Sequence, residues 1–178
     1  MYIETKNLIL RPFRPNDYLD LYEYLHEPGS PCFIDMKLNT LEDAKKEIQK
    51  RIDSKEKNYF AITLKSKNKV IGEIFACNET YLKDTYSPCW MINKVYQNKG
   101  YAYEAAVAFF KYLFTNLKAR RIYVYVQDYN LSSLKLCKKL GMRKEGLFKE
   151  YVSFLNNEDG SPRYENTYQY AILDKERK

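Results

Sequence analysis

A polar, glycine-containing stretch has the residue types of an anion-binding loop: Gln97, Asn98, Lys99, Gly100, Tyr101 and Ala102. The stretch lies between an apolar run and a helical pattern, where unpaired backbone N–H groups and the positive end of the helix dipole point outward. Gly100 lets the backbone pass close to a phosphate, and the small Ala102 leaves space for a ligand. The spacing matches neither a Walker loop nor Gly-x-Gly-x-x-Gly. A phosphate site and a polar turn before a helix are therefore both open interpretations.

The elements around this loop predict a strand, helix, strand unit. Residues 89–93 form the apolar run before the loop, and residues 121–126 read as the strand after the helix. The helix between them buries residues that share one face: Ala102, Ala105, Ala106, Phe109, Phe110 and Leu113. These two strands are expected to be parallel, with a right-handed crossover. A second helix is expected from about Ser132 to Leu140, ending at a left-handed Gly141.

The rest of the chain supplies antiparallel strands and two more helices. Strands are expected at 8–13, at 59–64 and 70–76 as a hairpin, and within 142–173 around a turn at 156–160. Helices are expected after Asp17, interpreted as a cap or first-turn acid, and after Thr40, with loop 28–39 between them covering a binding site. The sequence predicts a single α/β domain over residues 1–178, with a mixed, mostly antiparallel sheet flanked by about four helices.

Composition excludes several classes of protein. The 178 residues include 30 Lys or Arg and 23 Asp or Glu, a net charge of +7, and 45% are hydrophobic. This content supports a packed core and excludes a solenoid, a fibrous chain and a disordered tail. The cations are dispersed rather than clustered. A solvated surface is the simpler interpretation, while contact of some cations with nucleic acid or with a phosphorylated cofactor stays open.

The cysteines indicate whether the protein binds a metal, and the N-terminus indicates its cellular compartment. Cys32, Cys77, Cys89 and Cys137 form no Cys-x-x-Cys pair, and His26 is the sole histidine, so no metal site is expected. The N-terminus lacks a signal-peptide pattern, and no segment is apolar enough to span a membrane. We expect a cytoplasmic protein with reduced thiols, without a membrane partner.

Three separated motifs resemble one known family. Residues 97–102 resemble the Gln/Arg-x-x-Gly-x-Gly/Ala loop of the GCN5-related N-acetyltransferases. Residues 8–13 followed by Asp17 resemble the opening of the subgroup similar to ribosomal-protein N-acetyltransferases, and so do 130–133 followed by 139–142 and Glu145-Gly146. The three matches occur in the order and spacing that the family requires, and together they cover nearly the whole chain.

The resemblance implies an acetyl-CoA site without a metal. In this family the backbone of the loop binds the pyrophosphate, and pantetheine lies between two splayed parallel strands at the centre of the sheet. The strand backbone that would pair with pantetheine and polarise the thioester carbonyl is then at Met91, Ile92, Asn93 and Val95. Asn130 corresponds to a family asparagine beside the pantetheine arm, although it also reads as a helix cap. Ser133 and Cys137 share one helical face and can point toward the cofactor.

The catalytic groups are less clearly marked. Many family members have a proton-donating tyrosine where this sequence has Cys137. Cys137 is either a proton donor or, as we favour, a core residue, with Ser133 or water then serving the leaving thiolate. Candidates for the base are Glu73, Glu104 and Glu150; Glu73 is either a buried acid or faces the substrate cleft. Tyr164 and Glu165 match an aromatic-acid pair that the subgroup has on its last strand, on the acceptor side.

These observations predict direct transfer of an acetyl group from acetyl-CoA to a primary amine, by a monomer or a homodimer. The expected acceptor is a protein N-terminal α-amine, because an amine of pKa about 8 requires less from a base than a lysine-type amine of pKa about 10.4. One alternative is a small amine: a polyamine, an aminoglycoside or an amino acid. A basic ribosome- or RNA-binding module is the alternative from another class, although direct nucleic-acid binding is not expected.

Overall fold

The computed structural model describes residues 1–54, 58–79 and 81–177. Eight strands form one sheet in the order β1-β2-β3-β4-β5-β6-β8-β7. The strands are β1 (Ile3–Glu4), β2 (Leu8–Arg11), β3 (Tyr59–Leu64), β4 (Lys69–Asn78), β5 (Thr85–Ile92), β6 (Arg121–Gln127), β7 (Arg143–Asn156) and β8 (Pro162–Leu173). All neighbouring pairs are antiparallel except β5 and β6, which are parallel. The predicted mixed, mostly antiparallel sheet is confirmed.

In the described ranges, four α-helices and five short 3-10 helices accompany these strands. They are η1 (Pro15–Asp17), α1 (Tyr18–Leu25), η2 (Pro31–Met36), α2 (Leu41–Asp53), η3 (Lys65–Lys67), η4 (Lys94–Tyr96), α3 (Tyr101–Thr115), α4 (Leu131–Lys139) and η5 (Asp174–Glu176). The predicted caps are confirmed: Thr40 accepts from the backbone of Asp43, and Gly141 is left-handed at φ 75°. Within the described ranges, no helix is long and apolar enough to cross a membrane.

Asp17 does more than the sequence indicated. Its carboxylate begins the first helical segment by accepting from the backbone of Arg14, but it is also buried in a two-pronged ion pair with Arg11, at 2.7 and 2.8 Å. The Arg11 partner lies on the preceding strand. The ion pair therefore depends on the chain reversal between β2 and α1, which short-range capping patterns do not predict.

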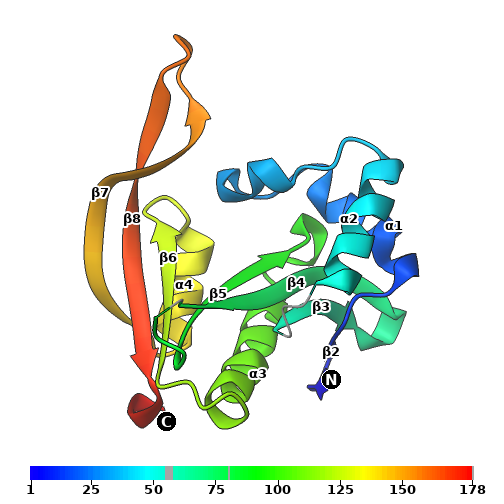
Figure 1. Cartoon of the computed structure of the whole chain (residues 1–178), viewed down its shortest axis with the longest axis horizontal. Helices are drawn as coiled ribbons and strands as arrows, with labels where there is room; N and C mark the ends of the chain where they lie inside the picture. Colours follow the sequence, from blue (N-terminus) through cyan, green and yellow to red (C-terminus); the bar gives the residue numbers. More distant parts are fainter. Residues whose placement is uncertain (55–57, 80, 178) are drawn as a thin grey trace.

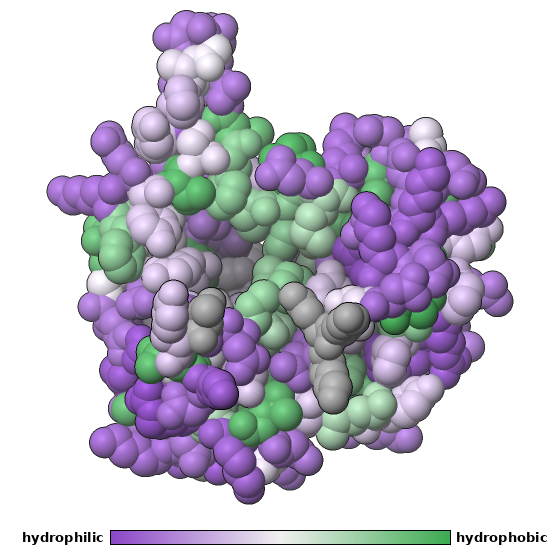
Figure 2. Space-filling view, viewed as in Figure 1, coloured by the Kyte–Doolittle hydropathy of each residue, from purple (hydrophilic) through white to green (hydrophobic). Residues whose placement is uncertain are grey.

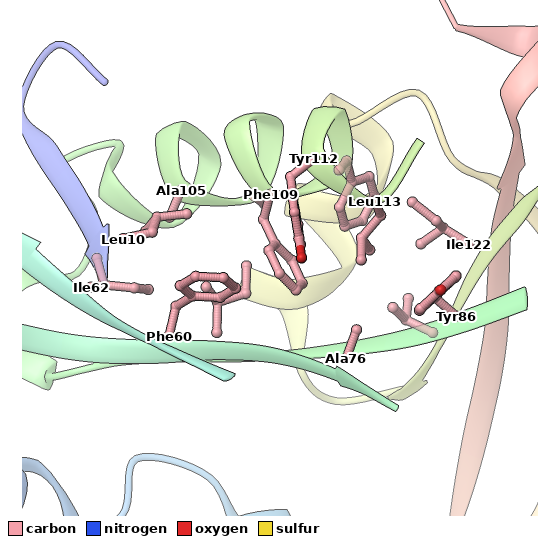
Figure 3. Packing of buried hydrophobic residues seen from close by; sticks show 14 of the residues in the cluster. Leu10, Phe60, Ile62, Ala76, Tyr86, Ala105, Phe109, Tyr112, Leu113 and Ile122 are labelled. Atoms are coloured by element: carbon pink, nitrogen blue, oxygen red, sulfur yellow. The ribbon is translucent and has the colours of Figure 1, made fainter. Parts of the chain in front are cut away.

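Helices cover both faces of the sheet. Helix α3 packs over one face, where Phe60, Phe109 and Leu113 meet in the larger core cluster (Figure 3). Helices α1 and α2 cover the other face over β3 and β4, with a second cluster around Leu21, Leu25 and Ile48. Figure 1 shows η2, the short helix between α1 and α2, reaching from this layer toward the β7–β8 hairpin.

The two parallel strands separate along their length. β5 and β6 are paired only at Thr85–Arg121 and Tyr86–Ile122; beyond that point β5 pairs with β4, and β6 pairs with β8. β5 begins at Thr85, earlier than the predicted 89–93, and includes Pro88. A proline is accommodated in a strand with an open edge, and β5 is unpaired on its β6 side beyond Tyr86. The divergence of β5 and β6 opens the sheet toward the N-terminus of α3.

The last two strands form a long hairpin that projects beyond the rest of the sheet (Figure 1). Three register shifts interrupt β7 along its pairing with β8. In Figure 2 the projecting tip is polar, and hydrophobic residues gather at its base. The predicted turn at 156–160 lies at this tip.

Candidate functional site

A cavity of about 340 Å³ lies where β5, α3 and α4 meet. Nine of the predicted cofactor residues line it: Met91, Ile92, Gln97, Asn98, Gly100, Tyr101, Ala102, Asn130 and Ser133. The tertiary structure therefore brings the glycine loop, the end of β5 and the start of α4 to one cavity. These segments are up to about 40 residues apart in the chain, and the strand-helix-strand unit folds them together.

The loop before α3 has the backbone geometry of an anion site. Asn98 and Gly100 are left-handed, with φ of 59° and 85°, and the first helical hydrogen bond runs from the N–H of Glu104 to the carbonyl of Gly100. The N–H groups of the first helical turn therefore lack intrahelical acceptors and carry the positive end of the helix dipole. The side-chain amide of Gln97 donates to the carbonyl of Ile92 at 2.9 Å, which connects the loop to the end of β5. An added Cβ on Gly100 meets no atom within 4 Å, so the need for glycine here is conformational.

The start of α4 forms the opposite wall. The side chain of Asn130 caps the helix by accepting from the N–H of Ser133 at 3.1 Å, so its predicted cap role is confirmed. The indole N–H of Trp90 donates to the hydroxyl oxygen of Ser133 at 3.3 Å, which ties β5 to α4 across the gap. The hydroxyl proton of Ser133 is then available to another acceptor.

Two lysines on α4 also line the cavity. Lys135 and Lys139 are four residues apart and face the cavity together with Ser132 and Leu136. Two ammonium groups beside a helix N-terminus suit a ligand with more than one phosphate. The predicted cation Lys99 does not line this cavity; its ammonium donates to the carbonyl of Val95 at 3.0 Å.

Asn93 and Val95 lie outside the main cavity. Both line a neighbouring cavity of about 160 Å³ that shares Met91 and Ile92 with the larger one. The side chain of Asn93 accepts from the N–H of Val95 at 3.1 Å and donates to Glu23 at 2.9 Å. These contacts give Asn93 a structural function at the end of β5.

Cys137 does not face the cavity. Its side chain is fully buried in the larger core cluster, and burial raises the pKa of the thiol to about 12. The cavity-facing side of α4 runs through Lys135 and Lys139, so the expectation that Ser133 and Cys137 both point toward the cofactor is wrong for Cys137. The structure supports the core interpretation, because a thiol held neutral inside an apolar cluster cannot reach a leaving thiolate.

Glu73 is a buried acid and does not face the cavity, which decides between the two alternatives predicted for it. Its carboxylate is 0% exposed and accepts from the hydroxyls of Tyr24 and Tyr59, each at 2.9 Å, and from Arg51 at 3.2 and 3.3 Å. These four bonds fill the acceptor positions of a carboxylate. Glu73 is therefore poorly suited to act as the base, and the structure favours a role in joining α1, α2, β3 and β4.

The other candidate bases are also placed away from the cavity. Glu104 accepts from Thr5 and from Asn7 at 2.6 to 2.8 Å. Burial opposes the shift, but these hydrogen bonds hold the pKa of Glu104 below its ordinary value, which suits a structural acid. Glu150 is exposed on β7 in a left-handed conformation, with φ of 49°. In the described part of the chain, no cluster of three or more His, Cys, Asp or Glu side chains could hold a metal ion.

Comparisons with known proteins identify the family. A family model described as an acetyltransferase (GNAT) domain matches residues 7–143. The chain belongs to the GNAT acetyltransferase family. It is 36% identical over 99% of both chains to the uncharacterized N-acetyltransferase YnaD of Bacillus subtilis. The crystal structure of a GNAT-family acetyltransferase from Bacillus anthracis superposes with a TM-score of 0.84, at 31% identity, covering 99% of this chain and 100% of that chain.

The fold is thus the single α/β GNAT-like domain that the sequence predicted, and the protein is an N-acetyltransferase. A ribosomal-protein-S5-alanine acetyltransferase from Vibrio fischeri has the same fold, with a TM-score of 0.74, 19% identity and coverage of 100% of this chain and 99% of that chain. At this identity the likeness concerns the fold alone. Enzymes of the GNAT family typically use acetyl-CoA.

The sequence did not predict several residues that line the larger cavity. They include Trp90, Tyr96, Tyr103, Lys135, Lys139 and, from the loop between α1 and α2, Gly29, Ser30 and Phe33. The glycine and prolines of that loop led to the prediction that it covers a binding site, but they did not identify Phe33. The spacing of Lys135 and Lys139 was a usable signal, since residues four apart on a helix share a face.

Proposed function

We propose that the cavity binds acetyl-CoA and that the protein acetylates an N-terminal α-amine of a protein. The observation that carries the proposal is the separation of β5 from β6 toward the left-handed Gly100 and the N-terminus of α3. Amides of pantetheine would continue the sheet along the open edge of β5, and the pyrophosphate would lie at the helix N-terminus. Lys135 and Lys139 add positive charge for the phosphates.

Within this proposal Ser133 serves the leaving thiolate. Its hydroxyl lines the cavity and already accepts from Trp90, so its proton points elsewhere. The backbone at Met91 and Ile92 would stabilise the oxyanion of the thioester by fixed dipoles. No residue forms an acetylated intermediate, since the amine attacks the thioester directly.

The α-amine is favoured as the acceptor for two reasons. Glu73, the acid on the central strand β4, is fully engaged, and an α-amine needs less help from a base because about a tenth of it is neutral at pH 7. The projecting β7–β8 hairpin also extends the surface beside η2 (Figure 1). A polypeptide acceptor can contact this extended surface, whereas a small amine is too short to use it.

Binding of acetyl-CoA is tested by calorimetry on the purified chain. Gly100→Val is expected to weaken acetyl-CoA binding at least about 10-fold, because a β-branched residue disfavours φ of 85° and distorts the loop. Gly160→Val is the matched control: Gly160 has φ of 83°, lies at the hairpin tip and also meets no neighbour within 4 Å. Absence of acetyl-CoA binding by the unaltered protein, or equal affinity in both variants, contradicts the proposal.

The acceptor is tested by thiol release from acetyl-CoA. Peptides with free N-termini are compared with the same peptides N-terminally blocked, with polyamines, with aminoglycosides and with free amino acids. Turnover that depends on the free N-terminus supports the α-amine. Turnover confined to a small amine supports the alternative instead.

A further inference from the structure

Trp90 is the one tryptophan of the chain, and it lines the larger cavity. It lies on β5 opposite Ile74, is half-buried, and packs against the larger core cluster. An indole N–H that is removed from water needs a hydrogen-bond acceptor, because desolvation without one costs free energy. Here the acceptor is the hydroxyl oxygen of Ser133, at 3.3 Å and 43 residues away in the chain. The tertiary structure therefore creates this pair, which links two walls of the cavity.

The chemistry of the two groups fixes the direction of this hydrogen bond. An indole N–H donates and cannot accept, so the Ser133 oxygen is the acceptor. A serine hydroxyl has one proton and two acceptor positions, and among the described residues the indole is its one hydrogen-bond partner. On a helix, a serine hydroxyl without such a partner readily donates to a backbone carbonyl of the preceding turn. The indole therefore directs the Ser133 proton away from β5.

The Trp90–Ser133 bond lies where the sheet opens. β5 pairs with β6 only up to Tyr86, before Trp90 is reached. Met91, the next residue of β5, has the backbone proposed to hold the thioester oxygen. On the helix side, the backbone N–H of Ser133 donates to the side chain of Asn130 at 3.1 Å. The bond to Trp90 therefore sets the distance between the strand that would hold the thioester and the helix that carries the hydroxyl.

We propose that Trp90 is a positioning residue, which directs the Ser133 proton toward the leaving thiolate and stabilises negative charge on the Ser133 oxygen. The inference rests on the proposed function, in which Ser133 serves the thiolate. An N–H that already points at an oxygen stabilises the charge that develops there, without reorganisation during the reaction. A hydrogen bond received by a hydroxyl also polarises the bond that this hydroxyl donates. Trp90 acts through Ser133, so its contribution to catalysis depends on that hydroxyl.

The proton transfer balances with this assignment. The neutral amine attacks the thioester carbon, so a C–N bond forms and the C–S bond breaks. The leaving thiolate takes the hydroxyl proton of Ser133, whose oxygen becomes negative while the indole N–H points at it. Ser133 then regains a proton from water, and the nitrogen releases its surplus proton to water. The products are an amide and CoA.

Trp90→Phe tests the proposal, because phenylalanine keeps an aromatic ring on β5 and removes the N–H. With the best acceptor of the panel, we expect kcat to fall about 5-fold, as for the loss of one neutral hydrogen bond. Acetyl-CoA affinity, measured by calorimetry, is expected to stay within about 2-fold, because the lost bond acts on the chemical step. A kcat equal to that of the unaltered protein would overturn the proposal.

A double variant shows whether Trp90 acts through the hydroxyl. Ser133→Ala alone is expected to lower kcat about 10-fold, and adding Trp90→Phe to it should lower kcat no further. Independent effects would multiply to a loss of about 50-fold in the double variant. That outcome would overturn the proposal, since Trp90 would then contribute without Ser133.

Tyr112→Phe is the matched control for the loss of an aromatic donor. The hydroxyl of Tyr112 donates to Asn58 at 3.3 Å, the same length, from the same core cluster. Tyr112 lies on α3 beside Phe109 (Figure 3), outside the lining of the two cavities described above. Its variant is expected to keep kcat within about 2-fold, because distant sites act independently. A 5-fold fall would show that any such loss in the core slows turnover, and would overturn the proposal.

A measurement without any change at Trp90 decides the matter if Trp90→Phe does not fold. The chain has one tryptophan, so isotope-labelled protein gives one indole N–H signal in nuclear magnetic resonance spectra. In the complex with CoA, we expect this N–H to exchange with water at least about 5-fold more slowly in the unaltered protein than in Ser133→Ala. Equal exchange rates would overturn the proposal, since the bond would be absent when the thiolate forms. Failure of acetyl-CoA to bind at all is a different result and contradicts the proposed function itself.

Discussion

Glu73 and Glu165 are acids buried on the same face of one sheet, but their surroundings differ in kind. Glu73 receives four hydrogen bonds, two of them from a buried guanidinium, and joins elements from four parts of the chain. Glu165 receives one from a tyrosine and one from a half-exposed arginine. A fully compensated acid stabilises a fold, whereas the stability that a partly compensated acid contributes depends on one neutral donor and one half-exposed cation.

The largest difference between the two regions is expected in stability. Arg51→Met leaves Glu73 buried and unpaired, and should lower the free energy of unfolding by about 3–5 kcal/mol. Arg163→Met removes a half-exposed partner of Glu165 and should cost at most about 1 kcal/mol. Urea unfolding followed by circular dichroism measures both. Equal losses would remove the distinction between the two acids.

A matched pair of tyrosine variants sharpens the comparison. Tyr24→Phe removes one donor to the fully buried Glu73 and is expected to cost about 1–3 kcal/mol of stability. Tyr129→Phe removes one donor to Glu165, but Tyr129 itself is 43% exposed, so water can replace the bond at a cost below about 1 kcal/mol. Thermal and urea unfolding of the two variants are the measurements. A larger loss in Tyr129→Phe would contradict the interpretation.

The same contrast between a buried group and a cavity-lining group applies to the two residues of α4. Ser133→Ala is expected to lower kcat about 10-fold, roughly 1.4 kcal/mol, because in the proposed mechanism the cavity-lining Ser133 hydroxyl serves the leaving thiolate. Cys137→Ala should keep kcat within 3-fold and change stability instead, since its side chain lies in the core. Thiol release under saturating acetyl-CoA separates the two. A dominant kinetic effect of Cys137→Ala would restore Cys137 as the proton donor.

The smallest expected effect appears at alkaline pH. Burial, followed by the charge of Glu73, raises the pKa of Tyr24 well above 10.0. A folded-state pKa above the unfolded value gives stability that is fully present below pH 10 and lost as the pH rises above it. Between pH 8 and 10.5 this group alone should cost about 0.8 kcal/mol, and Tyr24→Phe should be spared that loss. Urea unfolding of the unaltered protein and of Tyr24→Phe measures the difference. If both lose the same stability over this pH range, Tyr24 ionises freely in the folded protein and the prediction is wrong.

Local patterns in the sequence predicted the strands, the helix caps and the glycine loop. Thr40, Asn130 and Gly141 act within a few residues of themselves, so their functions follow from neighbouring sequence. The strand-helix-strand unit also determined that β5 and β6 are parallel. The same local reasoning placed Cys137 beside Ser133 on α4, although the helix turns Cys137 into the core.

The sequence by itself determined the fold, the family and the position of the glycine loop, which we propose holds the pyrophosphate, because each depends on short-range periodicity, capping and one backbone conformation. Only the tertiary structure decided what each buried acid does. The partners of Glu73 come from α1, α2 and β3, and those of Glu165 from the loop before α4 and from β8. A carboxylate's chemistry depends on the charges and donors that packing places around it, and these lie far away in the sequence.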